Sequence, residues 1–408
     1  MERGDKLFIQ GNSLLVVGNG FDVGLHLPTK YTDFMKNFLE YRCYIKQLPN
    51  PQNVNDDSNE ESKLYTKVYN LFKERMDKWK KQYKSFTPDN GNTTFDNTIF
   101  KNLLILILVF KYNYKELFRV KGINLTIEQP IEFLDEQYYR DTPITGDEIN
   151  WFNLEDILAE ISNQKKYASI MNNINKIAGN SHVLEFLEIK NRTNRGKDYN
   201  ELKNGLLFLK SCLSIYLQCV EDVYFSSISQ QTNDYFQKIL NDLEFHKNVN
   251  VRDYSEIISL NYTHSAEKLF KIPTKYPHGQ INTSATESSQ IVLGYYNSTE
   301  ENNFDTSFID FQKYYQRILL GTGNYETKDK SILYIDFYGF SCDPADTELI
   351  KFLLTNHNEA KRIRIFCYKD RGQNIINMVK SIGREQVLDL TKNQSNTNRP
   401  KLVFELIN

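Results

Sequence analysis

Long hydrophobic runs are absent from this chain of 408 residues. The longest, LLILILVF at Leu103 to Phe110, is too short to span a bilayer and is typical of a buried element. The opening MERGDKLFIQGNS has no long apolar segment before a small-residue cleavage site, so no secretory signal is expected. We therefore expect a cytoplasmic protein that does not associate with membranes.

Cysteine is scarce, and its spacing excludes the common structural uses of thiols. The five cysteines are odd in number and lack CxxC spacing, which argues against a disulfide framework and against a zinc site. They are Cys43, Cys212, Cys219, Cys342 and Cys367. No group of Asp, Glu and His has evident ligand spacing either, so no metal is predicted.

An excess of charge of one sign is also missing. Lys and Arg number 50 against 52 Asp and Glu, so no global field attracts nucleic acid or an anionic membrane. Glycine (18) and proline (10) are few, whereas Tyr and Phe are plentiful at 26 each. This composition indicates much regular structure with large side chains that pack its core.

The N-terminal part of the sequence predicts a strand, a glycine turn and a helix. Leu14 to Val17 form a short apolar run that ends at Gly18. From Tyr31 the apolar spacing becomes helical, with Asp33 in the first turn. The stripe is Phe34, Phe38, Tyr41 and Ile45.

The next two hundred residues are mostly of helical period. A polar, acidic segment from Asn50 to Ser62 predicts an exposed loop, and a basic segment from Lys190 to Asn200 predicts another. Between and after them run three helical stripes. These are Leu64, Val68, Leu71, Phe72 and Met76; Trp151, Leu154, Ile157, Leu158 and Ile161; and Leu206 to Val223.

Strand patterns return after Val249 and alternate with helical ones such as DTELIKFLLTNH. The predicted strands are EIISLNY ending near Asn261, QIVLGYY around Leu293, SILYIDFYGFS ending near Gly339, and RIRIFCY around Ile365. This alternation is typical of an open α/β sheet covered on both faces. We expect one discontinuous α/β domain, residues 1–50 plus 250–408, with a mainly helical insertion at 51–249.

The segment VVGNGFD carries the first motif with chemical content. Its glycines suit a tight turn against a pyrophosphate at a helix N-terminus. The dinucleotide fingerprint GxGxxG would need glycine at Val23, but the third glycine is Gly24, and no second strand ending in Asp or Glu lies about 20 residues on. No GxxxxGK[ST] is present. A standard nicotinamide dehydrogenase and a P-loop NTPase are both disfavoured.

Three later segments place polar groups after predicted strands, where open α/β sheets bind ligands. They are SLNYTHSAEKL, KYPHGQI and FYGFSCDPADTELI. Asn261 suits an amide or a ribose hydroxyl, and His278 is a proton carrier near neutral pH. Gly339 with Ser341 suits phosphate or ribose, whereas Asp343 and Asp346 suit helix caps equally well.

In their order along the chain these motifs resemble those of the AbiH family, bacterial abortive-infection factors that act against bacteriophage. The segments are GNGFDVGLHLPTKYTDF, WFNLEDIL, SLNYTH, YPHG and YGFSCDPAD, between residues 14 and 350. The first is the most specific. The resemblance implies a role in anti-phage defence.

The same order is similar to the wider group of sirtuin-like domains, with their Gly-x-Gly turn, Asn-x-Asp, His-Gly and late Gly-x-Ser. That resemblance implies a Rossmann-like, doubly wound, mainly parallel sheet that binds NAD and cleaves its nicotinamide–ribose bond. By position, the Asn falls on Asn261 and the His on His278. Thr263 stands where the group has Asp, and no four-cysteine zinc module is present, so deacetylation is not implied.

The resemblance and the residues together define a candidate site for NAD. Cleavage leaves oxocarbenium character on the ribose, which a carboxylate stabilises while a base activates water. The candidate catalytic residues are His278, Asn261, Asp22 and Glu155, with His264 and His26 ranked behind His278. The candidate cofactor-binding residues are Gly18, Asn19, Gly20, Phe21, Asp22, Thr263, Gly279, Gly339, Ser341 and Asp343. Asp22 also suits turn amides, and Glu155 a first-turn helix acid.

Three functions follow, in order. The first is an NAD glycohydrolase that depletes the cofactor of an infected cell. The second is a binding module that senses a nucleotide or a phage-derived trigger and changes its partner or homo-oligomeric state. The third, a metal-dependent nuclease toxin, ranks last because the near-neutral charge gives no electrostatic footprint for nucleic acid.

Overall fold

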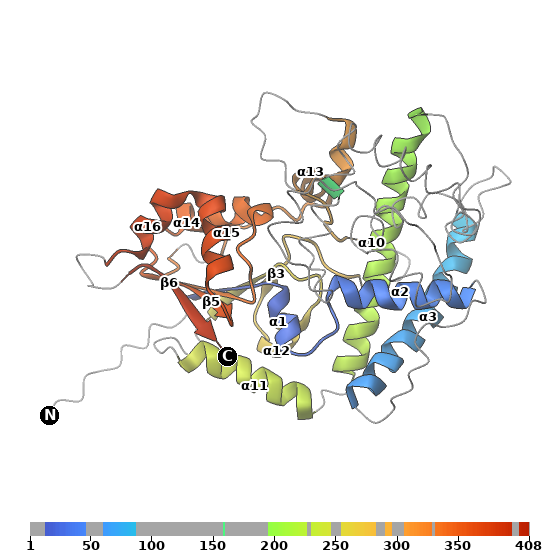
Figure 1. Cartoon of the computed structure of the whole chain (residues 1–408), viewed down its shortest axis with the longest axis horizontal. Coiled ribbons are helices and arrows are strands. Elements are labelled where there is room, and N and C mark those ends of the chain that lie inside the picture. The colour runs from blue at the N-terminus through green and yellow to red at the C-terminus, as the bar shows by residue number, and fades with distance from the viewer. Residues whose placement is uncertain are drawn as a thin grey trace, which may run out of the picture.

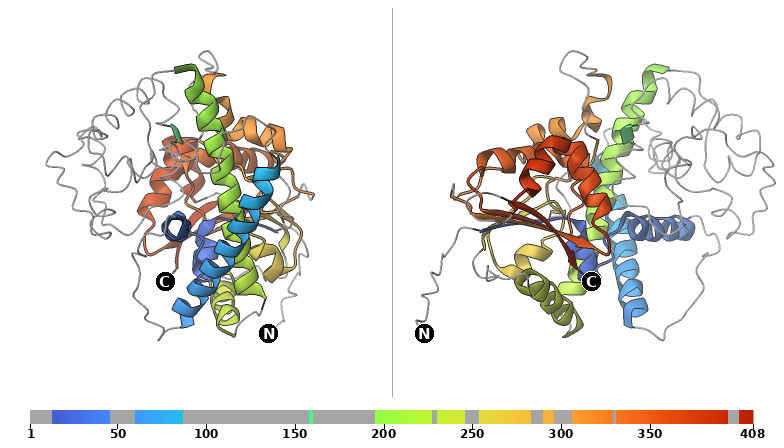
Figure 2. Two further views of the ribbon diagram at one scale, coloured as in Figure 1. Left: turned by 90° about the vertical axis from the view of Figure 1, so that its right-hand side faces the viewer. Right: turned by 60° about the vertical axis from the view of Figure 1, so that its left-hand side comes forward.

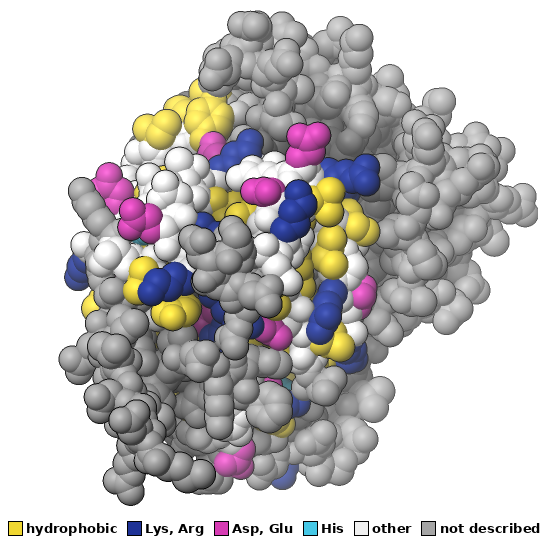
Figure 3. Space-filling model, turned by 90° about the vertical axis from the view of Figure 1, so that its left-hand side faces the viewer, with side chains coloured by type: hydrophobic (Ala, Val, Ile, Leu, Met, Phe, Trp, Pro, Cys, Tyr) yellow, Lys and Arg dark blue, Asp and Glu magenta, His cyan; other side chains and the backbone are white. Residues whose placement is uncertain are grey.

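The structure is a computed structural model of the chain. It describes residues 13–45, 60–86, 158–159, 195–226, 230–245, 254–282, 290–295, 306–328, 331–393 and 400–407. None of the helices in these ranges combines the length and the apolar character needed to cross a bilayer. On the face drawn in Figure 3, hydrophobic, basic and acidic side chains of the described residues lie interspersed, so no large patch of one sign forms there.

A six-stranded, all-parallel sheet forms the centre of the described fold (Figure 1). The strands are Ser13–Val17 (β1), Tyr254–Ser259 (β2), Thr274–Lys275 (β3), Tyr334–Tyr338 (β4), Arg362–Tyr368 (β5) and Leu402–Ile407 (β6). Their order is β3-β2-β1-β4-β5-β6, the order of a doubly wound Rossmann sheet. The Rossmann-like α/β fold that the sequence predicts is confirmed.

Strand β1 is apolar from Leu14 to Val17 because both faces of the sheet are covered. Leu14 and Val16 face a core made with three helices on one side of the sheet, and Leu15 and Val17 face a second core on the other side. The helices on the first side are Thr347–Asn356 (α14), Gly372–Ile382 (α15) and Arg384–Thr391 (α16), preceded by a short 3-10 helix, Pro344–Asp346 (η3). Figure 2 shows them together above the sheet.

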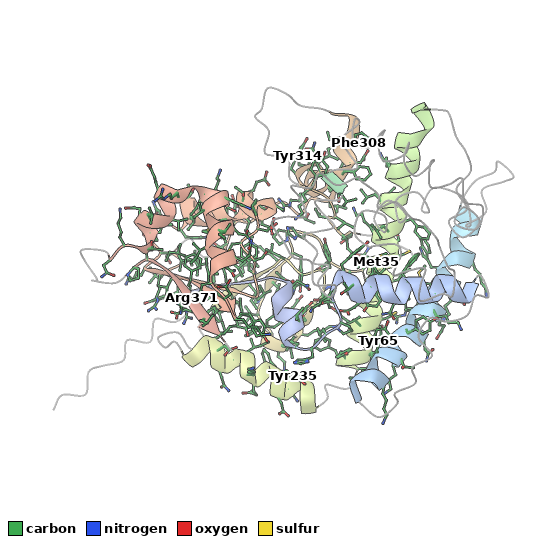
Figure 4. All side chains as sticks on the ribbon, in the orientation of Figure 1. Met35, Tyr65, Tyr235, Phe308, Tyr314 and Arg371 are labelled. Carbon is green, nitrogen blue, oxygen red and sulfur yellow. The ribbon has the colours of Figure 1, made fainter. Side chains whose placement is uncertain are left out.

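The second core holds the other helices and most of the buried aromatic rings. The helices are Asn19–Gly24 (α1), Tyr31–Ile45 (α2), Glu60–Phe86 (α3), Arg195–Phe225 (α10), Gln230–Phe245 (α11) and Ser265–Phe270 (α12). The predicted stripe of α2 is confirmed for Phe34, Phe38 and Tyr41, which are buried. Phe34 packs against Tyr216 of α10, with ring centroids 5.7 Å apart, and Phe72 of α3 contacts the same tyrosine. Met35, labelled in Figure 4, is fully buried here.

The described helices between residues 51 and 249 therefore share a hydrophobic core with the sheet. Helix α10 begins at Arg195, so the predicted loop at 190–200 is wrong in its second half. The predicted loop at 50–62 likewise overlaps helix α3, which begins at Glu60. The apolar run 103–110 and most of the stripe that begins at Trp151 lie outside the described residues. The domain boundaries near residues 50 and 250 stay a prediction.

The predicted strand around Leu293 is wrong, because residues 290–295 do not join the sheet. The side chain of Gln316 bonds this segment instead. Its Oε1 accepts from the N–H of Leu293 at 2.9 Å, and its Nε2 donates to the Leu293 carbonyl at 2.7 Å. Gln316 belongs to helix Lys313–Leu320 (α13), which follows the 3-10 helix Thr306–Phe311 (η2).

Candidate functional site

The candidate segments meet at the edge of the sheet where the parallel strands end. Beyond β1, the N–H of Gly18 donates to the carbonyl of Tyr338 at the end of β4. On the other side, the N–H of Leu260 beyond β2 donates to the carbonyl of Val17. Each predicted motif that the structure describes thus lies at the carboxyl edge, on either side of the point where the strand order reverses.

The two glycine turns at this edge touch each other directly. The N–H of Gly20 donates to the carbonyl of Gly339 at 2.9 Å. A Cβ on Gly18 or Gly20 would lie 2.6 or 2.7 Å from backbone atoms of Gly339. The N–H of Phe21 donates to the carbonyl of Gly18. The backbone N–H groups of Gly18, Gly20 and Phe21 therefore all donate to carbonyls of the protein itself. The close approach that the glycines allow is therefore of backbone to backbone.

Asp22 is the buried carboxyl at the centre of the site. Helix α1 starts directly after β1 and turns this side chain under the loop that follows β2. Its Oδ2 accepts from the hydroxyl of Thr263 at 2.6 Å, and its Oδ1 accepts from the hydroxyl of Ser265. Burial raises the pKa of Asp22 to about 6, although both hydroxyls act in the opposite direction.

Asn261 lies beside Asp22, but among the described residues neither polar atom of its side chain reaches a partner with full hydrogen-bond geometry; its one contact is a weak one with the Asp22 carboxyl. The residue is 5% exposed, and both its Oδ1 and its Nδ2 are buried and unpaired. Its amide is near enough to Asp22 to lower the pKa of that carboxyl slightly. An unpaired buried amide costs about 1–3 kcal/mol of folding free energy, so its presence calls for an explanation.

His278 is buried, and both its ring nitrogens lie near protein atoms. Nδ1 is 3.2 Å from the carbonyl oxygen of Leu260, and Nε2 is 3.0 Å from the guanidinium of Arg317. Burial lowers the pKa of His278 to about 4, so the ring is neutral at pH 7. Nδ1 faces an acceptor, the Leu260 carbonyl, whereas Nε2 lies near both the Arg317 donor and the Asp346 carboxylate.

Asp346 and two cations of α13 surround Nε2 of His278. Oδ1 of Asp346 is 3.0 Å from Nε2 and 3.5 Å from Nζ of Lys313, and Arg317 also binds Glu348 at 2.9 Å. Burial raises the pKa of Asp346, but these positive charges outweigh it and hold the pKa below its usual range. The predicted capping role of Asp346 is wrong, because its side chain makes no cap bond to α14.

The remaining predicted residues divide between buried contacts and the surface. Asp343 caps the 3-10 helix η3 and not α14 as predicted, since it accepts from the N–H of Ala345 at 2.8 Å. Ser341 is exposed, and Gly279 packs against the backbone of Gln290. Phe21 lies in the core, and Asn19 accepts from the hydroxyl of Thr29. Glu155 lies outside the described residues.

The two lower-ranked histidines have neighbours of their own. His26 stacks on Tyr235 of α11, the residue labelled in Figure 4, with ring centroids 3.9 Å apart. His264 lies beside Glu221 of α10, with Nδ1 3.2 Å from its carboxylate. Glu221, Lys313 and Arg317 are absent from the sequence-based site because charged residues on amphipathic helices give no local signal. Ser265 has a weak signal, two residues after Thr263 in SLNYTHS.

The fold and its carboxyl edge define an α/β protein of Rossmann-like order with a buried polar site after β1 and β2. Comparison with known families is more specific: the model described as bacteriophage abortive infection AbiH matches residues 14–368. The chain belongs to the AbiH family, which supports a role in abortive infection against phage. No curated protein and no solved structure matches the chain.

Proposed function

We propose that this protein binds a nucleotide, NAD, beside Asn261 and cleaves its nicotinamide–ribose bond during anti-phage defence. The observation that carries the proposal is the unpaired, buried amide of Asn261 next to the carboxyl of Asp22. A ligand that offers both a donor and an acceptor would satisfy Oδ1 and Nδ2 together. The ribose hydroxyls and the carboxamide of NAD each have both functions.

The charge of the site suits this reaction. Departure of nicotinamide leaves positive charge on the ribose, and an ionised carboxylate near it stabilises that charge. With a pKa of about 6, Asp22 is mostly ionised above pH 7 yet close enough to neutrality to exchange a proton. Thr263 and Ser265 would hold its two oxygens in place while the bond breaks.

His278 has a different part in this proposal from the one that the sequence suggests. Its two nitrogens are occupied by Leu260 and Arg317, and its ring is neutral at pH 7. These contacts support a role in holding the carbonyl of Leu260, and so the Asn261 that follows it. Asp22 is the better supported proton carrier.

Two asparagine variants of the purified chain test the proposal. Asn261→Ala removes an unpaired amide, so we expect stability to be kept or raised while NAD binding and nicotinamide release are lost. Asn37→Ala is the matched control. Asn37 of α2 is also buried, but its Nδ2 donates to the carbonyl of Asp33 at 2.8 Å, away from the candidate site. This control should lose stability and keep the nucleotide chemistry.

The measurements are calorimetric binding of NAD and chromatographic separation of its products, with and without phage lysate. Release of nicotinamide by the wild type and not by Asn261→Ala supports the glycohydrolase. Tight binding without release, with a change in oligomeric state, supports a nucleotide sensor instead. If Asn261→Ala binds and cleaves NAD as the wild type does, the assignment of the site is wrong.

A further inference from the structure

Helix α10 reaches the site through a single buried carboxylate, that of Glu221. Its side chain is 6% exposed and accepts from the backbone N–H of His264 and from Nζ of Lys268. The ring Nδ1 of His264 lies 3.2 Å from Oε1 of the same group. Glu221 thus contacts three groups of one short segment, residues 264–268: a backbone N–H, a lysine ammonium and a histidine ring.

The two residues on either side of His264 bind Asp22. Thr263 and Ser265 donate to Asp22, whereas His264 between them donates to Glu221. Adjacent residues of one stretch of backbone therefore hold two carboxylates, one from α1 and one from α10. Moving Glu221 would therefore move the residues that hold Asp22 and that follow Asn261.

The two carboxyl groups have different protonation properties. Burial raises the pKa of Glu221, but the hydrogen bond from His264 and the positive charge of Lys268 outweigh it and lower the pKa overall. At Asp22, burial raises the pKa, and the negative charge of Glu221 adds to the rise. Tyr276, beyond β3, is a further titratable group near both carboxyls, beside His264 and Lys268 at Glu221. Two neighbouring carboxyls whose pKa values are shifted in opposite directions are typical of reactive sites.

We propose that Glu221 is a positioning residue of the site, so that helix α10 holds segment 261–268 in the arrangement that presents Asn261 and Asp22 to a ligand. The identity of that ligand rests on the proposed function, but the link from Glu221 to Asp22 does not. Helix α10 is then part of the site and more than a cover for the sheet. A partner that shifts α10 would change the site without touching it.

The link is measured by titrating Asp22 in the full chain. Aspartate carboxyls labelled with ¹³C are followed by NMR, and the Asp22 signal is assigned with Asp22→Asn. In Glu221→Gln, Oε1 still accepts from His264, but the charge is gone, so the Asp22 midpoint should fall by roughly half a unit to one unit. In Lys268→Met, Glu221 loses its cation, so the midpoint should rise.

Glu267→Gln is the matched control, because Glu267 is exposed on the same short helix and bonds only the hydroxyl of Tyr276 in the described contacts. It should leave the Asp22 midpoint unchanged. A folded Glu221→Gln with an unchanged midpoint would overturn the proposal, and Lys268→Met, whose lysine is 41% exposed, decides the matter if Glu221→Gln does not fold.

Nucleotide affinity gives the second readout. Glu221→Ala, which removes the acceptor for the His264 N–H, should weaken NAD binding about tenfold, whereas Glu221→Gln, which keeps that acceptor, and Glu267→Gln should bind nearly as the wild type does. Equal affinity in a folded Glu221→Ala and the wild type would contradict the positioning role. If the wild type itself binds no NAD, the proposed function fails, while the two shifts of the Asp22 midpoint still decide the role of Glu221.

Discussion

The hydroxyl of Thr263 donates a hydrogen bond to Oδ2 of Asp22 across 2.6 Å and so fastens the loop after β2 to helix α1. Both residues are 1% exposed. A carboxylate in place of Thr263 would face the charge of Asp22. The hydroxyl instead stabilises the ionised form of Asp22, against the effect of burial.

Replacing that hydroxyl should show this effect directly. In Thr263→Val the pKa of Asp22 should rise above 6, and the free energy of unfolding at pH 8 should fall by about 1–3 kcal/mol. The loss should be smaller at pH 5, where Asp22 is protonated. Urea unfolding at the two pH values measures this, with Thr263→Ser as the control that keeps the hydroxyl. An equal loss at both pH values would contradict it.

Asp22 should also give the whole protein a dependence of stability on pH. Its folded pKa of about 6 lies above the ordinary value of 3.8, so its favourable contribution is complete below pH 4 and is lost as the pH rises through 6. The loss amounts to roughly 3 kcal/mol. Asp22→Asn should remove it, so that the variant gains stability relative to the wild type at pH 8. Asp389→Asn, at a side chain 82% exposed, should behave like the wild type.

His278 should act at the acid end of the range. Its folded pKa of about 4 lies below the ordinary 6.5, so the stability it contributes is complete above pH 6.5 and is lost as the pH falls through 4. In His278→Gln, which keeps a polar group near Arg317, the part of the acid destabilisation due to this ring, roughly 3 kcal/mol, should disappear. Thermal unfolding between pH 4 and 8 measures the difference. Wild-type and variant curves that stay parallel would show that the ring does not titrate in this way.

The contact between the glycine turns predicts unequal costs for two glycine substitutions. Gly339 and Gly321 both have positive φ, 62° and 66°, but only at Gly339 would a Cβ meet backbone, 2.2 Å from the nitrogen of Phe21. Gly321→Ala should cost about 1–2 kcal/mol of unfolding free energy from the left-handed conformation alone. Gly339→Ala should cost more than about 4 kcal/mol or prevent folding. Equal costs, measured by urea unfolding, would mean that the turns separate readily.

The sequence predicted those parts of the fold that have a strong local signal. Alternation of apolar strands and amphipathic helices gave β1, β2, β4, β5 and α14 close to their observed bounds. The segment at Leu293 is as apolar as a strand, but the Gln316 side chain bonds its backbone, and no local pattern reveals such a contact. β3 has two residues only, and its pairing is set by β2.

For the candidate site, the motifs predicted the edge of the sheet at which the polar groups meet. Asp22, Asn261 and Thr263 come together as their motifs suggest. The sequence did not predict which polar groups of the site already have hydrogen-bond partners, as His278 has. It also did not predict which residues of distant helices, such as Glu221, contact the site. Both depend on contacts between segments far apart in the chain, which spacing within a motif does not encode.

The central position of β1 has a consequence for synthesis. Its two neighbours, β2 and β4, begin at Tyr254 and Tyr334. During translation β1 is therefore synthesised first, and more than half of the chain must follow before either partner strand exists. Helices α2, α3 and α10 leave the ribosome in the meantime. Pairing over such separations is slow compared with local structure. A nascent or truncated chain therefore has no carboxyl edge around Asp22, and whatever chemistry this edge performs begins only when nearly all of the protein has been made.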